Sequence, residues 1–302
     1  MTEVAPSDQL LVVIDPVAHR SDGESVRIAK DVLSAGAATK VCLPAGPEEF
    51  ARALARRGSR RPVVVGDDRA LLRAVSLLHR QRALGACAVS LVPVGGVLSL
   101  ARSLGVPMGA VAAARAVLDG RERRMDLLVD DSDGVVVGTL RIPSVALPSP
   151  GAVPFSGPGE GSGSGSGSGP GESAAARPPW LRTCQSLVRT LASRPGRLIA
   201  APAPEASRPS RLRVEVDGVL VVDLDQPVES VSVTPGVLGG AEVEVRPVSL
   251  GAAVAPIRVV GRRVTVSGAD FRYRADALVG GPVRTRTWVV WEGAWGLTLP
   301  VG

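Results

Sequence analysis

The sequence predicts a mixed fold, in which an N-terminal doubly wound α/β domain is followed by a C-terminal β-sandwich-like domain. Short apolar runs alternate with helix-patterned segments over residues 9–129, an order typical of a parallel sheet with helices on both faces. From residue 211 to residue 300 the pattern is that of strands alone. A Gly-Ser repeat at residues 161–169 separates the two regions, and such a repeat cannot bury apolar area.

The N-terminal domain is expected to begin with a buried strand at residues 10–14, which Asp15 and Pro16 end before a polar turn through residues 22–23. Apolar runs predict three further strands, at residues 40–43, 61–65 and 88–92. Apolar residues at helical spacing predict helices at residues 24–35, from Pro47 onward, at 69–79, in a segment ending near 105, and at 108–118. Ligands of such sheets bind beyond the carboxyl ends of the strands, so a site is expected in the turns that follow them.

The middle of the chain marks the change to β structure. Residues 123–129 and 134–142 pattern as a β-hairpin, residues 148–176 as a flexible linker and residues 180–193 as a helix. We therefore divide the chain into an α/β domain (1–129), the hairpin and linker (130–176), and a β-sandwich-like domain (177–302) whose open end Trp291 and Trp295 are expected to cover. Strands are expected at residues 212–216, 219–224, 230–233, 241–246, 257–260, 263–267, 283–291 and 297–299.

Composition excludes several classes of site. Of the 302 residues, 45% are hydrophobic but only 3% aromatic, so the cores have to be built from aliphatic side chains. The three cysteines are too few and too far apart for a disulfide framework and are expected as buried thiols. The chain has only two histidines, and no cluster of cysteines and histidines has the spacing of a zinc site. We therefore expect no metal site. These residues are Cys42, Cys87, Cys184, His19 and His79.

Charge and hydropathy indicate where the protein acts and with what. No run of about eighteen apolar residues and no signal peptide occurs, which predicts a cytoplasmic protein. The net charge of +6 favours acidic partners, namely a nucleotide or an anionic membrane surface bound peripherally; a solvated arginine-rich surface is the alternative. Nucleic acid is not expected, because the tryptophans lie outside the basic clusters at residues 56–61 and 121–124.

The turn at residues 66–69 separates a predicted buried strand from a predicted helix. The first N–H groups of a helix have no partner within the helix, and the helix dipole is positive there, so anionic groups such as phosphate dock at this place. The same residues also fit an ordinary turn in which an aspartate caps the helix. A second glycine-containing turn, at residues 93–97, is expected beside Gly66.

Residues 10–16, 63–71 and 93–107 together resemble the bacterial diacylglycerol kinase family of lipid kinases. The resemblance covers residues 9–129 well and residues 211–300 more weakly. It implies that an α/β nucleotide-binding domain and a β-sandwich enclose ATP, magnesium and the hydroxyl of a lipid. The matching residues are Pro16, Val17, residues 63–66, Asp68, Leu71, Pro93, Gly95 and residues 101–107. The nucleotide-binding residues that it implies are Asp15, Pro16, Gly66, Asp67, Asp68, Arg69, Gly95 and Gly96.

The positions that would carry the chemistry depart from the family pattern. The GGDGT loop of the family reads Gly-Asp-Asp-Arg-Ala at residues 66–70, so Asp67 and Arg69 replace glycines that let the backbone approach phosphate. The GTGND loop reads Gly-Gly-Val-Leu-Ser at residues 95–99. The DGE motif reads Asp-Ala-Leu at residues 276–278, which puts Leu278 in place of the carboxylate base and leaves Asp276 as the one catalytic candidate.

These departures predict a pseudokinase with residual ATP, ADP or lipid binding, in which ATP binds weakly and magnesium is not required. Phosphoryl transfer depends on positioning and charge neutralisation, so the loss of several parts together is severe. One alternative is an active ATP-dependent lipid kinase that phosphorylates a diacylglycerol-like hydroxyl, with Asp276 replacing the missing base. The other is a protein-interaction scaffold that binds no nucleotide.

Overall fold

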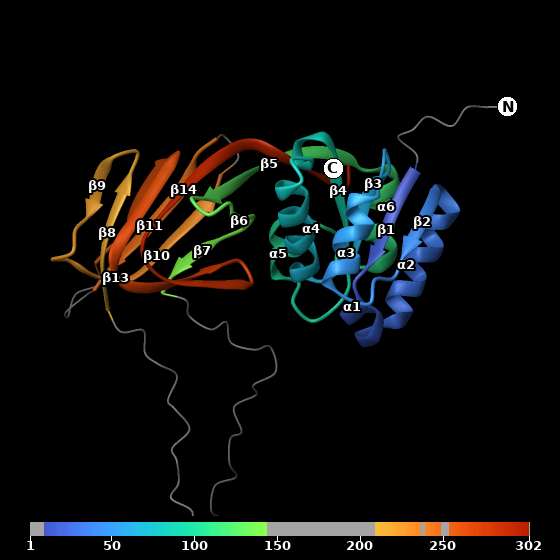
Figure 1. Ribbon diagram of the computed structural model, residues 1–302, viewed down its shortest axis with the longest axis horizontal. Helices are drawn as coiled ribbons and strands as arrows, with labels where there is room; N and C mark the ends of the chain where they lie inside the picture. Colours follow the sequence, from blue (N-terminus) through green and yellow to red (C-terminus); the bar gives the residue numbers. More distant parts are fainter. Residues whose placement is uncertain (1–8, 144–208, 237–238, 249–253, 302) are drawn as a thin grey trace, which may run out of the picture. The chain divides into compact units, whose positions relative to one another are not determined.

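Parallel strands form the centre of the N-terminal part of this computed structural model, which describes residues 9–143, 209–236, 239–248 and 254–301 (Figure 1). They pair in the order β2-β1-β3-β4. The inner strands β1, β3 and β4 are almost entirely apolar and buried, as expected between two layers of helices, whereas β2 forms a half-exposed edge. The strands are β1 (Gln9–Ile14), β2 (Ala38–Cys42), β3 (Arg61–Gly66) and β4 (Ala88–Pro93).

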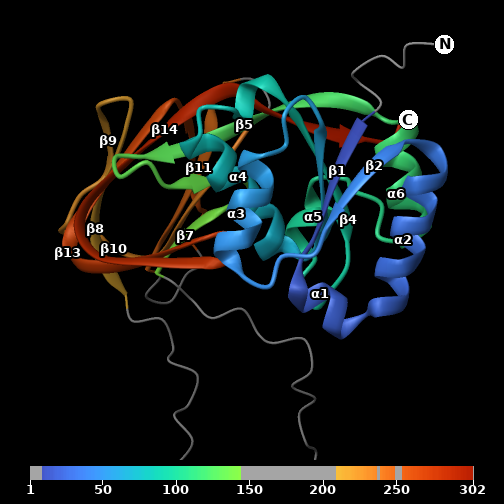
Figure 2. The same ribbon diagram turned by 45° about the vertical axis from the view of Figure 1, so that its right-hand side comes forward.

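Helices pack against both faces of this sheet. Successive side chains of β1 point to opposite faces, so Leu11 packs in a cluster with residues of α3 and α4, and Leu10 in a cluster with residues of α2 and α6. Figure 2 shows α2 and α6 side by side. The predicted mixed α/β character is therefore confirmed. The helices are α2 (Gly23–Gly36), α3 (Pro47–Ala55), α4 (Asp68–Arg80), α5 (Ser99–Ser103) and α6 (Ala110–Asp119), with a 3-10 turn, η2, at Leu84–Ala86.

A short helix, α1 (Pro16–Ser21), replaces the polar turn that the sequence predicted after the first strand. The Asp15 carboxylate accepts a hydrogen bond from the backbone N–H of Val17 at 2.9 Å and so caps the helix. Pro16 occupies the first helical position, where its missing N–H costs nothing. The Asp-Pro pair therefore ends the strand as expected, but it also starts a helix.

The C-terminal part of the described chain is antiparallel. Its strands pair in the order β12-β11-β10-β7-β13-β14, where β7 is Leu140–Ile142 and β14 is Leu278–Leu299, and β8 pairs with β9, β10 and β13. The predicted turn at Asp217-Gly218 joins β8 to β9, and both residues have positive φ, 51° and 81°, as a two-residue hairpin requires. The strands are β8 (Ser210–Val216), β9 (Val219–Val222), β10 (Pro227–Pro235), β11 (Ala241–Pro247), β12 (Ile257–Gly261) and β13 (Arg263–Ala275).

The predicted hairpin exists, but its second arm is interrupted. β5 (Arg121–Asp130) pairs with the short β6 (Val135–Val136), and the chain then leaves that ladder before β7 (Leu140–Ile142), which pairs with β10 and β13. The backbone N–H groups of residues 137–139 donate to the Asp276 carboxylate instead of to a neighbouring strand. The Asp276 carboxylate, from a distant segment, therefore interrupts the arm at residues 134–142 that the sequence predicted as one strand.

The last strand, β14 (Leu278–Leu299), corrects the predicted assignment of residues 283–291 and 297–299 to separate strands of the C-terminal domain. Its first half pairs with β13 and its second half with β5, while Gly296 and Leu297 pair in parallel with Ala88 and Val89 of β4. The end of the chain thus extends the parallel sheet beyond β4 (Figure 1). Because Leu297 is completely buried in a cluster with residues of β4 and β5, apolar packing accounts for this position.

Trp291 and Trp295, near the end of β14, were predicted to cover the open end of the β-sandwich-like domain together, but they lie in different environments. Trp295 is completely buried in the cluster that contains Leu11, and its indole N–H donates to the Asp126 carbonyl oxygen at 3.3 Å. Trp291 is 41% exposed and lies against His79, with ring centroids 5.2 Å apart. The predicted packing role therefore holds for Trp295, although the core that it fills is the one on the helical side.

Two predictions concern residues outside the described ranges, namely the linker at 148–176 and the helix at 180–193, which contains Cys184. Among the described residues, Cys42 and Cys87 are half-buried and form no disulfide. No helix in the described ranges is both long and apolar enough to cross a membrane.

Candidate functional site

Three turns at the carboxyl ends of β1, β3 and β4 form the candidate site, and backbone hydrogen bonds hold them together. The N–H of Asp15 donates to the Val65 carbonyl oxygen at 2.8 Å, and the N–H of Val94 to that of Gly66 at 3.0 Å. The N–H of Asp68 reaches the Val97 carbonyl oxygen at 2.9 Å. The sequence-predicted residues at 15–16, 66–69 and 95–96 therefore do come together in space.

Two of the glycines are required by close packing of these turns. A Cβ on Gly66 would lie 2.7 Å from the Cβ of Ala70 and 3.0 Å from that of Asp15, so the turn closes only without a side chain. Gly95 has φ +131°, and a Cβ there would lie 3.1 Å from the Cβ of Asp67. Gly96, by contrast, has open space where its side chain would be. Gly66 and Gly95 thus serve the packing of the turns.

Asp67 caps helix α4 with its own side chain. Its Oδ1 accepts hydrogen bonds from the backbone N–H groups of Arg69 and Ala70, at 3.0 and 3.1 Å. Burial raises the pKa of the Asp67 carboxyl; the N–H of Ala70 opposes this, and the nearby charge of Asp15 adds to it. Two donors that a phosphate would use at this helix end are therefore already bound to a carboxylate.

Asp68 is directed away from the first turn of α4 and towards α5. Its carboxylate accepts hydrogen bonds from the backbone N–H groups of Leu100 and Ala101, at 2.8 and 2.9 Å, and from the Ser99 hydroxyl at 3.2 Å. The residue is only 2% exposed. Its observed role is to fix the start of α5 against the first turn of α4.

Arg73 is a site residue that the sequence analysis missed. Its Nη1 lies 2.9 Å from Oδ1 of the buried Asp15, and its guanidinium lies over the Phe50 ring, 5.5 Å from the centroid. Arg73 follows the exposed Arg69 by four residues, which places the two side chains one turn apart on the same side of α4. This four-residue spacing was the feature of the sequence that could have identified Arg73. It places Arg73 one helical turn after the altered loop, on the side of α4 that faces the end of β1.

Asp276 is brought near these turns from the other part of the chain. The backbone of Asp276 has φ +51°. Its carboxylate accepts hydrogen bonds from the backbone N–H groups of Val137, Gly138 and Thr139, each at 2.8 Å. Burial raises the pKa of the Asp276 carboxyl, these N–H groups oppose the shift, and the charge of Asp68 adds to it. Leu278, at the position of the family's base, is 58% exposed.

In this arrangement a nucleotide phosphate would meet a carboxylate where it needs hydrogen-bond donors. The helix end that would donate hydrogen bonds to phosphate presents the Asp67 carboxylate, and the buried Asp15 is already paired with Arg73. In the described ranges, no group of three or more His, Cys, Asp or Glu residues has a geometry that could hold a metal ion. The carboxylates of the site instead hold helices and loops in place.

Comparisons with known proteins agree at the level of the fold. The sequence matches no protein-family model and no curated protein. Three solved structures from Bacillus anthracis str. Sterne match over 97% of this chain and 97% of theirs, at 10–11% sequence identity. Two of these proteins are described provisionally, and one without qualification, as diacylglycerol kinases; the TM-scores are 0.65, 0.64 and 0.61. The chain therefore shares the fold of these three structures.

Proposed function

We propose that the protein is a diacylglycerol-kinase-like pseudokinase, which keeps the fold and weak nucleotide binding but transfers no phosphate. The observation that carries this proposal is the cap that Asp67 forms on α4. An incoming phosphate has to displace this carboxylate from two N–H donors and then remain next to its negative charge. At an effective dielectric of about 20, two unit charges about 4 Å apart repel by about 4 kcal/mol, which is enough to weaken binding severely.

The environment of Asp276 supports the second half of the proposal. A general base has to come within hydrogen-bonding distance of the hydroxyl proton that it removes. Three backbone N–H groups of the loop that joins β6 to β7 already donate to the carboxylate of Asp276, a half-buried residue. To act as a base it has to give up these bonds, and the loop that depends on them has to open. Asp276 therefore suits a structural role better than proton transfer.

Weak nucleotide binding has support from the side chains that remain cationic. Arg69 is exposed at the first turn of α4, and its charge acts on Asp67. The guanidinium can also reach an anionic group at the same turn, which partly offsets the repulsion from Asp67. The site is thus expected to bind ATP or ADP with low affinity and without a requirement for magnesium.

The direct test is transfer of radiolabelled phosphate from millimolar ATP to a mixed lipid extract that contains diacylglycerol. We expect no transfer by the wild type, because a missing general base typically costs about 10²–10⁴-fold in rate at any ATP concentration. Leu278→Glu is expected to restore some activity, with Leu278→Gln as the matched control, since this position is exposed and tolerates both side chains.

Two outcomes would contradict the proposal. Wild-type turnover that Asp276→Asn abolishes, in a variant that urea denaturation shows to be folded under the assay conditions, would identify an active lipid kinase in which Asp276 is the base. Absence of any ATP or ADP binding in a calorimetric titration at millimolar nucleotide would exclude residual nucleotide binding and favour a scaffold.

A further inference from the structure

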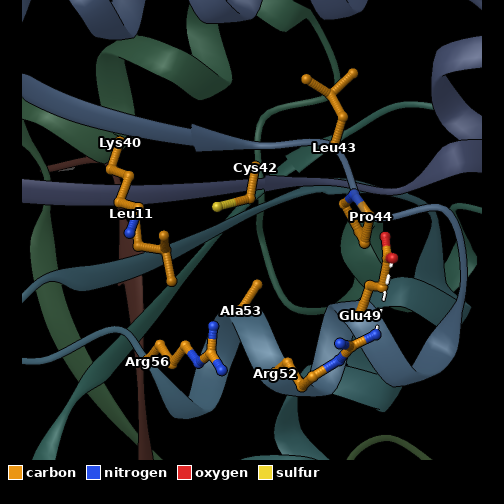
Figure 3. A pocket seen from close by; sticks show the side chains of 9 residues that line it. All are labelled: Leu11, Lys40, Cys42, Leu43, Pro44, Glu49, Arg52, Ala53 and Arg56. Atoms are coloured by element: carbon orange, nitrogen blue, oxygen red, sulfur yellow. Dashed lines mark ion pairs between the residues drawn. The ribbon is translucent and has the colours of Figure 1, made fainter.

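A pocket of about 350 Å³ lies between the edge strand β2 and helix α3 (Figure 3). Its lining comes from β1, β2, the segment that joins β2 to α3, α3 itself and Arg56 directly after α3. None of these residues belongs to the turns at 15–16, 66–69 and 93–96, and none has a part in the proposed function. The volume falls within the range of about 300–1,000 Å³ that is usual for small-molecule sites.

Cationic side chains dominate the pocket but are not equivalent. Arg52 lies 3.7 Å from Glu49, an ion pair that Figure 3 shows at one end of the pocket. The charged ends of Lys40 and Arg56 lie at the opposite end. Within the described residues, neither Lys40 nor Arg56 has a carboxylate at ion-pairing distance. That end of the pocket therefore has positive charge without compensation.

The walls between these two ends are apolar. Leu11, completely buried in the core below, forms the floor, and Ala53 of α3 faces it. The Cys42 thiol points into the space between Lys40 and Ala53 (Figure 3). An apolar surface next to unpaired cations suits a molecule with an anionic group at one end and an apolar body.

We propose that this pocket binds a small amphipathic anion, a carboxylate or a phosphate monoester attached to an apolar body. The anionic group pairs with Lys40 and Arg56, and the body lies against Leu11 and Ala53. Four charged side chains contribute three positive charges and one negative charge, so an anionic ligand is favoured over a cationic ligand of the same size. Arginine and lysine also bind such groups through hydrogen bonds that their charge strengthens.

Each cation also has an ordinary structural explanation. Arg56 follows the last turn of α3, where a positive charge offsets the helix dipole. Lys40 lies on an edge strand, where lysine discourages pairing with other chains. These explanations require no ligand and predict that neutralising the two residues has no effect on anion binding. The experiment has to separate the two cases.

The test is a calorimetric titration of the full chain with hexyl phosphate. We expect saturable binding that Lys40→Gln and Arg56→Gln each weaken by about tenfold, which corresponds to about 1.4 kcal/mol. Arg52→Gln is the matched control and should weaken binding less, because Glu49 already pairs with that side chain. Hexanol and inorganic phosphate, which each lack one half of the probe, are expected to bind more weakly than hexyl phosphate.

Alkylation of Cys42 gives an independent measurement at the same place. Bound hexyl phosphate should slow the reaction of Cys42 with N-ethylmaleimide several-fold, while Cys87, which does not line the pocket, reacts at an unchanged rate in the same peptide map. The proposal is overturned by an absence of saturable binding, by equal binding to the Lys40→Gln variant, or by equal binding of hexanol. Competition with ATP that Asp67→Gly strengthens would place the probe at the strand ends and overturn it as well.

Discussion

Asp276 and Thr139 are hydrogen-bonded to each other in both directions. The N–H of Asp276 donates to the Thr139 carbonyl oxygen at 2.9 Å, and the N–H of Thr139 donates to Oδ1 of Asp276 at 2.8 Å. Together with Val137 and Gly138, which also donate to this carboxylate, the pair joins the β6–β7 loop to the turn before β14. Asp276, which the sequence predicted as the candidate catalytic base, therefore holds the β6–β7 loop in place.

Asp276→Asn should lower the free energy of unfolding by about 1–3 kcal/mol, because an amide replaces one accepting oxygen and leaves a buried N–H without a partner. Asp276→Ala should cost more, since all three N–H groups lose their acceptor. Urea denaturation of both variants measures the effect. Asp270→Asn is the control, because that aspartate is exposed and its partner Arg284 is also exposed. Equal stability of all three variants would show that the carboxylate does not hold the loop.

Substitutions in the first turn of α4 should change ATP affinity in opposite directions. Asp67→Gly removes the repelling charge and exposes two N–H donors, so ATP should bind more tightly, by about tenfold or more. Arg69→Gly should weaken binding, because it removes the exposed cation. Isothermal titration with ATP gives both values.

Asp67→Asn separates the two contributions of that aspartate. Asparagine keeps the helix cap but carries no charge, so its ATP affinity should lie between those of the wild type and Asp67→Gly. Weaker ATP binding by Asp67→Gly than by the wild type would mean that this turn does not face the nucleotide.

The Asp133 carboxyl has a pKa below its usual value of 3.8, chiefly because it is hydrogen-bonded to His79, whose Nε2 lies 2.8 Å from Oδ1. A carboxyl with a lowered pKa in the folded state contributes stability above the unfolded-state value, and this contribution disappears as the pH falls through the folded-state pKa. The stability that the Asp133 carboxylate contributes, measured as the difference between wild type and Asp133→Asn, should therefore be lost as the pH falls below 3.8.

Carbon-13 NMR titration of the Asp133 carboxyl is the direct measurement. In His79→Leu the titration midpoint should move up towards 3.8, whereas Asp225→Asn, at an exposed residue elsewhere, should leave it unchanged. An unchanged midpoint in His79→Leu would assign the lowered pKa to the neighbouring arginines instead.

The two tryptophans near the end of β14 should differ sharply in their contribution to stability. Trp295→Ala removes a completely buried ring and a hydrogen bond to Asp126, with an expected loss of about 3–5 kcal/mol in the free energy of unfolding. Trp291→Ala removes a ring that is 41% exposed and contacts His79, with an expected loss of about 0.5–1.5 kcal/mol. Thermal and urea denaturation compare them, and a larger loss for Trp291→Ala would contradict the assigned packing.

The sequence by itself was sufficient for the elements whose stability is local. The helix from Pro47 and the turn at Asp217-Gly218 follow from helix capping and turn preferences, which act within a few residues, and both are present. The strands that became β1, β3 and β4 were evident because strands buried on both faces are nearly continuous apolar runs. Their parallel arrangement brings the turns at residues 15, 66 and 95 to one edge of the sheet, as the sequence predicted.

Only the tertiary structure decided which partner each polar or apolar group has. The motif at residues 66–70 shows that Asp67 and Asp68 are both negatively charged. It does not show that Asp67 caps α4 or that Asp68 accepts a hydrogen bond from the N–H of Leu100. The pairing of Leu297 with Val89 joins positions more than two hundred residues apart along the chain, and no local pattern encodes such a register. Hydrogen-bond acceptors and apolar side chains at the strand ends each have several possible partners of similar energy locally, and packing of the whole chain selects one.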